Sequence, residues 1–241
     1  MLSPSPVVVF LLDVDNTLLD NDHFAADLDA RLKQDFGTEQ AGRYWALYSA
    51  LRDLNGFADY LGALQQFRVH NEDKPALLGL SAFLLEYPFA ERFYPRALAV
   101  IEHLRVLGTT VIFSDGDIVF QPRKIQRSGL WEAVHGRVMV CLHKEDELDL
   151  VRLRFPARHY VAVDDKPVLL AAMKRVLGKK LTTVHVQQGH YASVEPVPLN
   201  AAPDVTVTHI GSLIDLTLAD FHASPVVTHR RQKSTTIRKQ P

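Results

Sequence analysis

The stretch VVVFLLDVDNTLLD, residues 7–20, decides the fold. Six apolar residues run directly into Asp13, and a second acid, Asp15, follows two positions later. A short apolar run that begins after Pro6 and ends at an acid is typical of a strand buried on both faces of a parallel sheet. Because buried carboxylates destabilise a fold unless a partner compensates their charge, the two acids raise the question of what they hold.

From residue 94 onward, segments with strand character alternate with segments with helical character. Strands are expected at 109–113, 137–142, 159–163, 181–186 and 204–208, and helices at 95–108, 119–129, 145–155, 167–178 and 211–221. This alternation predicts an α/β fold, a Rossmann-like parallel sheet with helices on both faces.

The block from residue 20 to 93 shows helical periodicity and no strand pattern. Helices are expected at 23–37, 42–56, 57–70 and 75–88, each flanked by Gly or Pro. We therefore predict three parts. They are an α/β core of residues 1–19 and 94–225, an inserted α-helical cap of residues 20–93, and a basic tail of residues 226–241.

Composition bounds the class of protein. The chain has 241 residues, of which 47% are hydrophobic, and a formal net charge of -1, which does not favour nucleic acid as a partner. Residues 226–241 hold five basic and no acidic residues, and we expect them to be disordered, with a nucleic-acid or membrane arm as the alternative. The chain has a single cysteine, no apolar run long enough to cross a membrane and no basic leader. We therefore expect a cytoplasmic protein without a membrane partner. A monomer or a homodimer is expected.

Polar side chains follow four of the expected strands. A single acid at a strand end is usually a turn former or a helix cap. Here several follow different strands, and the carboxyl ends of parallel strands lie at one edge of the sheet, so these side chains are expected to lie together. So many carboxylates at one edge indicate a cation, and oxygen donors with room for water favour Mg²⁺. The residues concerned are Asp13, Asp15, Ser114, Asp115, Lys144, Asp164 and Asp165.

A lysine and a hydroxyl beside a Mg²⁺ site indicate phosphate chemistry. The cation and Lys144 can neutralise phosphoryl oxygens, and Ser114 can donate a hydrogen bond to them. A carboxylate can then act as the nucleophile and form an aspartyl-phosphate.

These residues resemble the motifs of the haloacid dehalogenase-like superfamily over the chain up to about Phe221. DVDNTLLD at 13–20 resembles the first motif, D-x-D-x-T, and FSDGD at 113–117 resembles the second. Lys144 is similar to the third-motif lysine, although no proline follows it, and VAVDDKP at 161–167 resembles the acidic fourth motif. The helical block stands where subfamily I carries its C1 cap.

The resemblance implies a role for each site residue. Asp13 would be the nucleophile and a Mg²⁺ ligand. Asp15 would be general acid and then general base, with its main-chain carbonyl on the metal. Asp165 would bind the metal directly and Asp164 through water. Ser114, Asp115 and Lys144 would surround the phosphate, and Thr17 would support the first loop.

The same resemblance separates the candidate activities. Hydrolytic dehalogenases lack the second acid, because a halide leaves without a proton, whereas phosphatases and phosphomutases keep it. The presence of Asp15 therefore predicts a Mg²⁺-dependent phosphomonoester hydrolase that acts on a small phosphorylated metabolite. A sugar phosphomutase, a 2-haloacid dehalogenase and a non-catalytic binding protein remain alternatives.

The helical cap is expected to select the substrate, which the sequence does not identify. Its aromatic residues are expected in the cap core and its arginines in solvent, although Arg43 and Arg52 could bind a second anionic group. Lys166 is expected to be a solvated helix start, with a ligand as the alternative. The segment 187–191 could line the site, but an ordinary loop is expected. The cap candidates are His23, Arg43, Tyr44, Trp45, Arg52, Tyr60 and Arg68.

Overall fold

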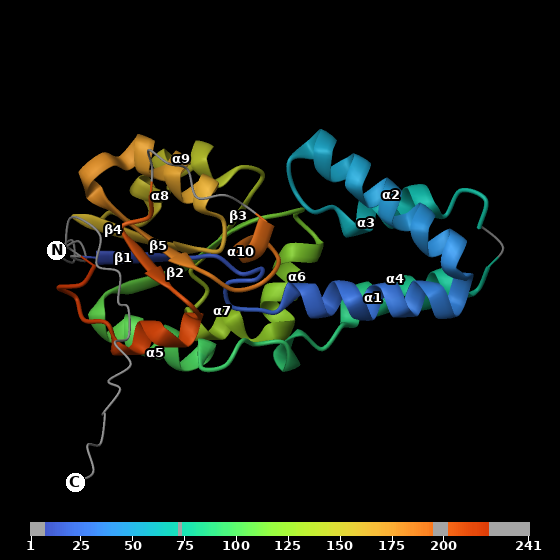
Figure 1. The fold of residues 1–241 in the computed structure, drawn as a ribbon, viewed down its shortest axis with the longest axis horizontal. Coiled ribbons are helices and arrows are strands. Elements are labelled where there is room, and N and C mark those ends of the chain that lie inside the picture. Colours follow the sequence, from blue (N-terminus) through green and yellow to red (C-terminus); the bar gives the residue numbers. More distant parts are fainter. Residues whose placement is uncertain (1–7, 72–73, 195–201, 222–241) are drawn as a thin grey trace, which may run out of the picture.

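The computed structural model describes residues 8–71, 74–194 and 202–221, so the basic tail at 226–241 lies outside the described residues. Six strands form one sheet in the order β3-β2-β1-β4-β5-β6, and every neighbouring pair is parallel (Figure 1). The strands are β1 (Val8–Leu12), β2 (Thr109–Asp115), β3 (Val138–Cys141), β4 (His159–Asp164), β5 (Leu181–Val186) and β6 (Val205–Val207). The predicted parallel sheet is confirmed.

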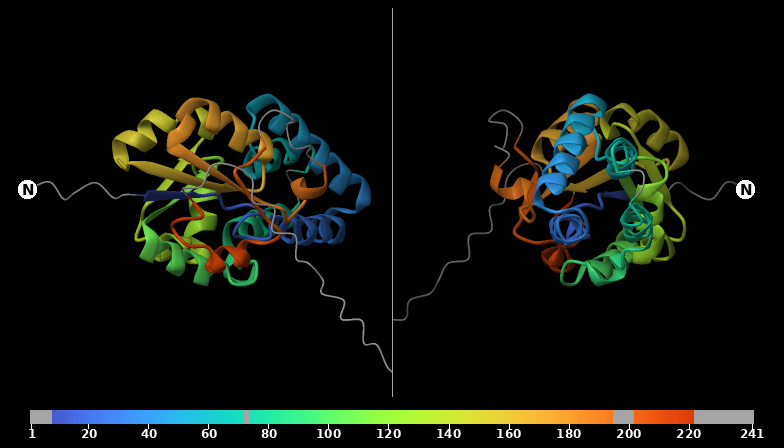
Figure 2. Two further views of the ribbon diagram at one scale, coloured as in Figure 1. Left: turned by 60° about the vertical axis from the view of Figure 1, so that its left-hand side comes forward. Right: turned by 90° about the vertical axis from the view of Figure 1, so that its right-hand side faces the viewer.

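Helices cover both faces of the sheet, as Figures 1 and 2 show. Successive residues of a strand point to opposite faces. Accordingly, Val9 and Leu11 of β1 pack with one group of helices, and Phe10 packs with another group on the opposite face. On the first face lie α8 (Leu148–Arg154) and α9 (Pro167–Leu177); on the second lie α5 (Ala97–Leu107), α6 (Phe120–Ser128), α7 (Leu130–Ala133) and the 3-10 helix η4 (Ile210–Asp215).

The segment between β1 and α5 forms a helical insert at the end of the sheet where the strands finish (Figure 1). The insert leaves and re-enters the core at neighbouring positions, because Asp20 N–H donates to Arg92 O (2.7 Å) and Tyr94 N–H donates to Leu18 O (3.0 Å). We propose residues 20–93 as the cap on this basis. Its helices are α1 (Asn21–Phe36), α2 (Thr38–Asn55), α3 (Tyr60–Phe67), α4 (Ala76–Glu86) and the 3-10 helix η1 (Phe89–Glu91).

Several elements differ from the sequence expectations: α2 begins at Thr38 instead of residue 42, and the helix expected at 145–155 is divided into η2 (Lys144–Asp146) and α8. Helix α3 starts only at Tyr60, because the Asp59 carboxylate caps it by accepting the Gly62 N–H (2.7 Å). The helix expected at 211–221 is only the 3-10 turn η4. The short helix α7 was not expected, because four residues are too few to show a period. The remaining short elements are η3 (Gly178–Lys180) and α10 (Tyr191–Val194).

One buried apolar cluster runs from the sheet into the insert. Phe24 of α1 contacts Phe120 of α6 with ring centroids 5.7 Å apart and Phe89 with centroids 5.1 Å apart. All three rings belong to the same buried cluster as Phe10 of β1. The insert and this face of the sheet therefore share a core. None of the described helices combines the length and apolar character that crossing a membrane requires.

Candidate active site

The loop after β1 places Asp13 at the carboxyl edge of the sheet. The order of strands along the sheet changes direction between β1 and β4. The register pairs Leu12 with Val163, so Asp13 lies beside Asp164. This is the crevice where open α/β sheets bind ligands. Asn16 turns the chain with φ 58°, and its Oδ1 accepts the N–H of Asn21 (3.0 Å), which fixes the loop against the first turn of α1.

Lys144 joins the ends of three strands. Its Nζ donates to Asp13 Oδ1 (2.5 Å) and to Asp164 Oδ2 (2.8 Å), and the side chain is buried. Asp115 at the end of β2 holds the lysine in place, because its Oδ1 accepts the Lys144 N–H (2.9 Å). Burial opposes the charge of Lys144, but Asp13 and Asp164 outweigh burial and keep the pKa of this lysine well above its ordinary range.

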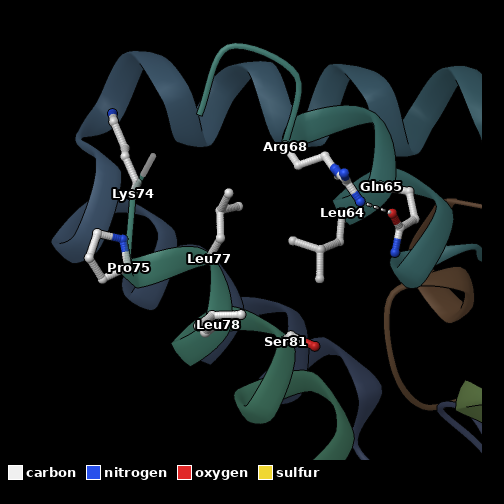
Figure 3. A pocket seen from close by; sticks show the side chains of 8 residues that line it. All are labelled: Leu64, Gln65, Arg68, Lys74, Pro75, Leu77, Leu78 and Ser81. Carbon is white, nitrogen blue, oxygen red and sulfur yellow. Dashed lines mark hydrogen bonds between the residues drawn. The ribbon is translucent and has the colours of Figure 1, made fainter. Parts of the chain in front are cut away.

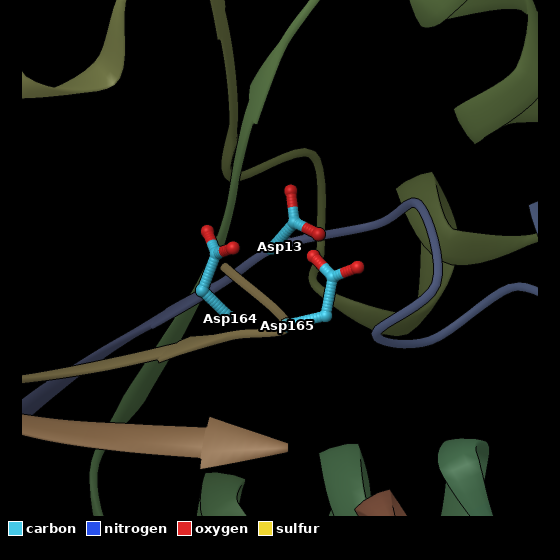
Figure 4. A group of neighbouring side chains, drawn as sticks. All are labelled: Asp13, Asp164 and Asp165. Atoms are coloured by element: carbon cyan, nitrogen blue, oxygen red, sulfur yellow. The ribbon is translucent and has the colours of Figure 1, made fainter. Parts of the chain in front are cut away.

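Three buried carboxylates gather at the same place. Asp13, Asp164 and Asp165 each offer an oxygen, and these oxygens lie within 4.8 Å of one another (Figure 4). Burial raises the pKa of Asp13 to about 6, with Lys144 opposing the shift and Asp164 reinforcing it. Burial also raises the pKa of Asp165 well above its ordinary value, and the charges of Asp164 and Asp13 add to the effect.

Asp165 fits a cation ligand better than its neighbour does. Neither oxygen of Asp165 has a hydrogen-bond partner among the residues that the structure describes, although the side chain is fully buried. Asp164, in contrast, uses Oδ2 for Lys144 and Oδ1 for the Lys166 N–H (3.0 Å). A buried, unpartnered carboxylate beside two others suits a hard divalent cation such as Mg²⁺.

Asp15 faces a different set of partners. Its side chain is 29% exposed, its Oδ1 accepts from Lys124 Nζ (2.6 Å), and its Oδ2 accepts from Gln121 Nε2 (3.0 Å). The same Gln121 amide also donates to Ser114 Oγ (2.8 Å). Neither Gln121 nor Lys124 was predicted from the sequence as a site residue. Both lie in the buried stripe of α6 together with Ile125, where apolar residues are usual, and the burial of this stripe is known only from the structure.

A cavity of about 360 Å³ opens onto these groups. Its walls come from the strand ends and from the C-terminal half of α2 with the loop that follows it. It therefore places the catalytic candidates opposite residues of the insert. It is lined by Asp13, Asp15, Asn16, Asn21, Tyr48, Arg52, Gly56, Phe57, Ala58, Ser114, Asp115, Lys166 and Tyr191.

Of the seven expected cap residues, the structure places only Arg52 at this cavity. Arg43 instead donates to Val69 O (2.8 Å), and Tyr44 is a core residue whose hydroxyl donates to the main-chain carbonyl of Tyr60. Arg68 points into a second cavity inside the insert, between α3 and α4, where it donates to Gln65 Oε1 (3.3 Å) (Figure 3). The remaining three also face other partners: His23 lies near Asp27, Trp45 donates to Asp29, and Tyr60 is buried in the aromatic cluster.

Two expectations near the fourth motif are wrong. Lys166 is not a solvated helix start, because it lines the cavity and its ammonium lies 5.1 Å from the ring centroid of Tyr191. The segment 187–191 supports the site, because Gln188 Nε2 donates to the carbonyls of Asn16 (3.1 Å) and Thr17 (2.8 Å). Neither contact can be predicted from a local sequence pattern, because the two partners in each are far apart in the sequence.

The fold defines an α/β protein of the Rossmann-like class, and the ionisable side chains described above gather at the carboxyl edge of its sheet. The chain is 53% identical to a haloacid dehalogenase-like hydrolase from Burkholderia xenovorans LB400, with a TM-score of 0.82, over 89% of this chain and 100% of that chain. The chain therefore belongs to the haloacid dehalogenase-like hydrolase superfamily, which confirms the resemblance seen in the motifs.

More distant structures share the fold. Magnesium-bound YfnB from Bacillus subtilis is 14% identical with a TM-score of 0.59, over 88% of this chain and 98% of that chain. An L-2-haloacid dehalogenase from Xanthobacter autotrophicus is 17% identical with a TM-score of 0.55, over 87% of this chain and 96% of that chain. No protein-family model and no curated protein sequence matches the chain. Because the superfamily holds both dehalogenases and other hydrolases, membership leaves the reaction to the site.

Proposed function

We propose that this protein is a Mg²⁺-dependent phosphomonoester hydrolase that acts on a small phosphorylated metabolite through an aspartyl-phosphate on Asp13. The observation that carries the proposal is that two carboxylates, Asp13 and Asp15, line one cavity with separate partners. A halide departs without a proton, so a dehalogenase needs only the nucleophile. An alcohol needs a proton as it leaves, which gives the second carboxylate a task.

The proposed reaction has two displacements at phosphorus. An oxygen of Asp13 attacks phosphorus, and the bond to the leaving oxygen breaks while Asp15, which enters this step in its carboxylic acid form, gives that oxygen its proton and becomes a carboxylate. Asp15 then takes a proton from water, the water oxygen attacks the aspartyl-phosphate, and phosphate departs with Asp13 restored. The charge of Lys144 and the hydroxyl of Ser114 stabilise the phosphoryl oxygens in both displacements.

The buried carboxylates supply the proposed metal site. Asp13 and Asp165 would bind Mg²⁺ directly, Asp164 through water, and Asp15 through its main-chain carbonyl. When bound, the cation supplies positive charge that neutralises phosphoryl oxygens. Because the Asp115 carboxylate already accepts the Lys144 N–H, we propose that Asp115 serves the phosphate by positioning Lys144.

The test is phosphate release from p-nitrophenyl phosphate with Mg²⁺, with EDTA, and by Asp13→Asn. We expect activity that requires the cation and is lost in the variant. The matched control is Asp149→Asn, an exposed carboxylate of α8, which should keep wild-type activity. Halide release from 2-chloropropionate without phosphate release would instead establish a dehalogenase and overturn the proposal.

A further inference from the structure

Lys124 of α6 is a buried lysine whose ammonium group contacts the Asp15 carboxylate. The side chain is 1% exposed, and its Nζ donates to Asp15 Oδ1 (2.6 Å) and Asn21 Oδ1 (3.0 Å). Burying an ammonium is strongly unfavourable unless a charge and hydrogen bonds compensate it. Asp15 is the carboxylate that does so here, and the two side chains therefore fix each other.

Aromatic rings enclose the lysine on its other sides. Its Nζ lies 5.8 Å, 5.3 Å and 5.1 Å from the ring centroids of Phe24, Phe89 and Phe120. Rings favour a cation over their faces and leave little space for another position of the ammonium. Lys124 is thus held at one point, and so is the carboxylate oxygen it contacts.

A second donor fixes the other oxygen of Asp15. Gln121 Nε2 donates to Asp15 Oδ2 (3.0 Å), and Gln121 stands one turn before Lys124 on the same face of α6. With a separate donor on each oxygen, the plane of the carboxyl group is set by α6. The Asn21 contact also ties Lys124 to the first residue of α1, where the insert begins.

We propose that Lys124 is a positioning residue that aims Asp15 at the leaving oxygen of the substrate. This inference rests on the proposed phosphomonoester hydrolase. Lys124 exchanges no proton and touches no substrate. It orients the group that gives a proton to the leaving alcohol and later takes one from water. Misplacement of a catalytic group by about 1 Å can cost on the order of 10²-fold in rate, so the effect should be measurable.

The test compares leaving groups in wild type and Lys124→Met. Values of kcat/KM are measured for 4-nitrophenyl, phenyl and 4-methoxyphenyl phosphate, which are similar in shape and differ in how much the leaving oxygen needs a proton. For Lys124→Met we expect a loss of on the order of 10²-fold on the 4-methoxyphenyl ester and less than about threefold on the 4-nitrophenyl ester. An equal loss on all three esters would overturn the inference.

Two further variants separate positioning from folding. In an Asp15→Asn background, Lys124→Met should change kcat/KM less than about twofold, because a residue that acts through Asp15 has nothing left to aim. Gln121→Leu should steepen the leaving-group dependence in the same direction and serves if Lys124→Met does not fold. Independent, multiplying losses would contradict the inference.

The matched control is Lys174→Met, a lysine of α9 that pairs with Asp204 (2.7 Å) outside the cavity. It should lower Tm without changing the ratio between esters. If wild type releases no phosphate from any ester, the proposed function fails and the inference falls with it. If wild type is active and the leaving-group dependence is unchanged in Lys124→Met, only the inference fails.

Discussion

Asp165 is a buried carboxylate that accepts no hydrogen bond from the residues that the structure describes. Its two oxygens are buried without a described hydrogen-bond partner, while the adjacent Asp164 is fully engaged. In the cation-free protein the raised pKa of Asp165 means that the folded state binds its proton more tightly than the unfolded chain does. Its contribution to stability therefore falls as pH rises above the ordinary value of 3.8.

A cation that binds the ionised carboxylate should reverse this loss. We expect the rise in Tm on adding Mg²⁺ to be larger at about pH 8 than at about pH 5, because binding requires deprotonated ligands. Asp165→Asn should abolish the Mg²⁺-dependent rise. It should also stabilise the cation-free protein at about pH 8 by roughly 1–3 kcal/mol, since an amide has no ionised form for burial to disfavour.

Thermal unfolding with and without Mg²⁺ across this pH range is the measurement, with Asp149→Asn as the control for loss of one carboxylate. A Tm shift in Asp165→Asn as large as in wild type would mean that the cation binds elsewhere.

Single residues also show what the sequence could predict about the site. Acids and a lysine placed directly after strands were predictable, because parallel strands bring their carboxyl ends to one edge whatever the rest of the fold does. The structure does bring Asp13, Lys144, Asp164 and Asp165 together. Lys124 was not predictable, because a lysine on a helix is usually solvated and only the packing of α1 against α6 reveals its partner.

At the scale of elements, α2 places two arginines that look equivalent in the sequence in different surroundings. Arg43 is held near the start of the helix by Val69 O and by the ring of Phe67, whose centroid lies 5.8 Å from the guanidinium carbon. Arg52, in the last turn, lines the same cavity as Asp13 and Ser114. The sequence left both as candidates for a second anionic group, and the geometry favours Arg52.

We expect Arg52→Gln to raise KM roughly tenfold or more for phosphomonoesters that also carry a carboxylate or a second phosphate, because a charge-assisted hydrogen bond is worth about 1.5–3 kcal/mol. For esters with an uncharged alcohol the change should stay below about twofold, since Arg52 then has no anion to bind. Arg43→Gln, on the same helix, is the control and should leave KM unchanged for both kinds of ester. Steady-state kinetics on paired substrates checks this. The same rise for both ester classes would show that Arg52 only shapes the cavity.

For the whole molecule, the shared core predicts how the chain unfolds. The sequence predicted a helical block and an alternating α/β region, because the two differ in period. It gave no sign that the two are packed through one cluster, since Phe24 and Phe120 are far apart in the chain. Packing between distant segments depends on how their side chains fit together in space. The hydrophobic periodicity of a sequence carries no information about that fit.

We therefore expect the insert and the sheet to unfold in one cooperative transition. Phe24→Ala should lower the free energy of unfolding by about 3–5 kcal/mol and affect both regions equally. The two tryptophans report on them separately, because Trp45 lies in α2 and Trp131 in α7. Urea unfolding of Trp45→Phe and Trp131→Phe, followed by fluorescence, should give coincident midpoints. An earlier transition seen through Trp45 would show that the insert unfolds on its own.

The insert departs from and rejoins the core at adjacent positions, and every group proposed to contact phosphorus lies outside residues 20–93. The proposed chemistry and the proposed substrate recognition therefore lie in separate segments of the chain. Mutations in the last turn of α2 and the loop after it can alter which molecule enters the cavity while the reaction stays the same. A lineage with this architecture can acquire new substrates by changing one contiguous segment, as long as Phe24 keeps its place against α6.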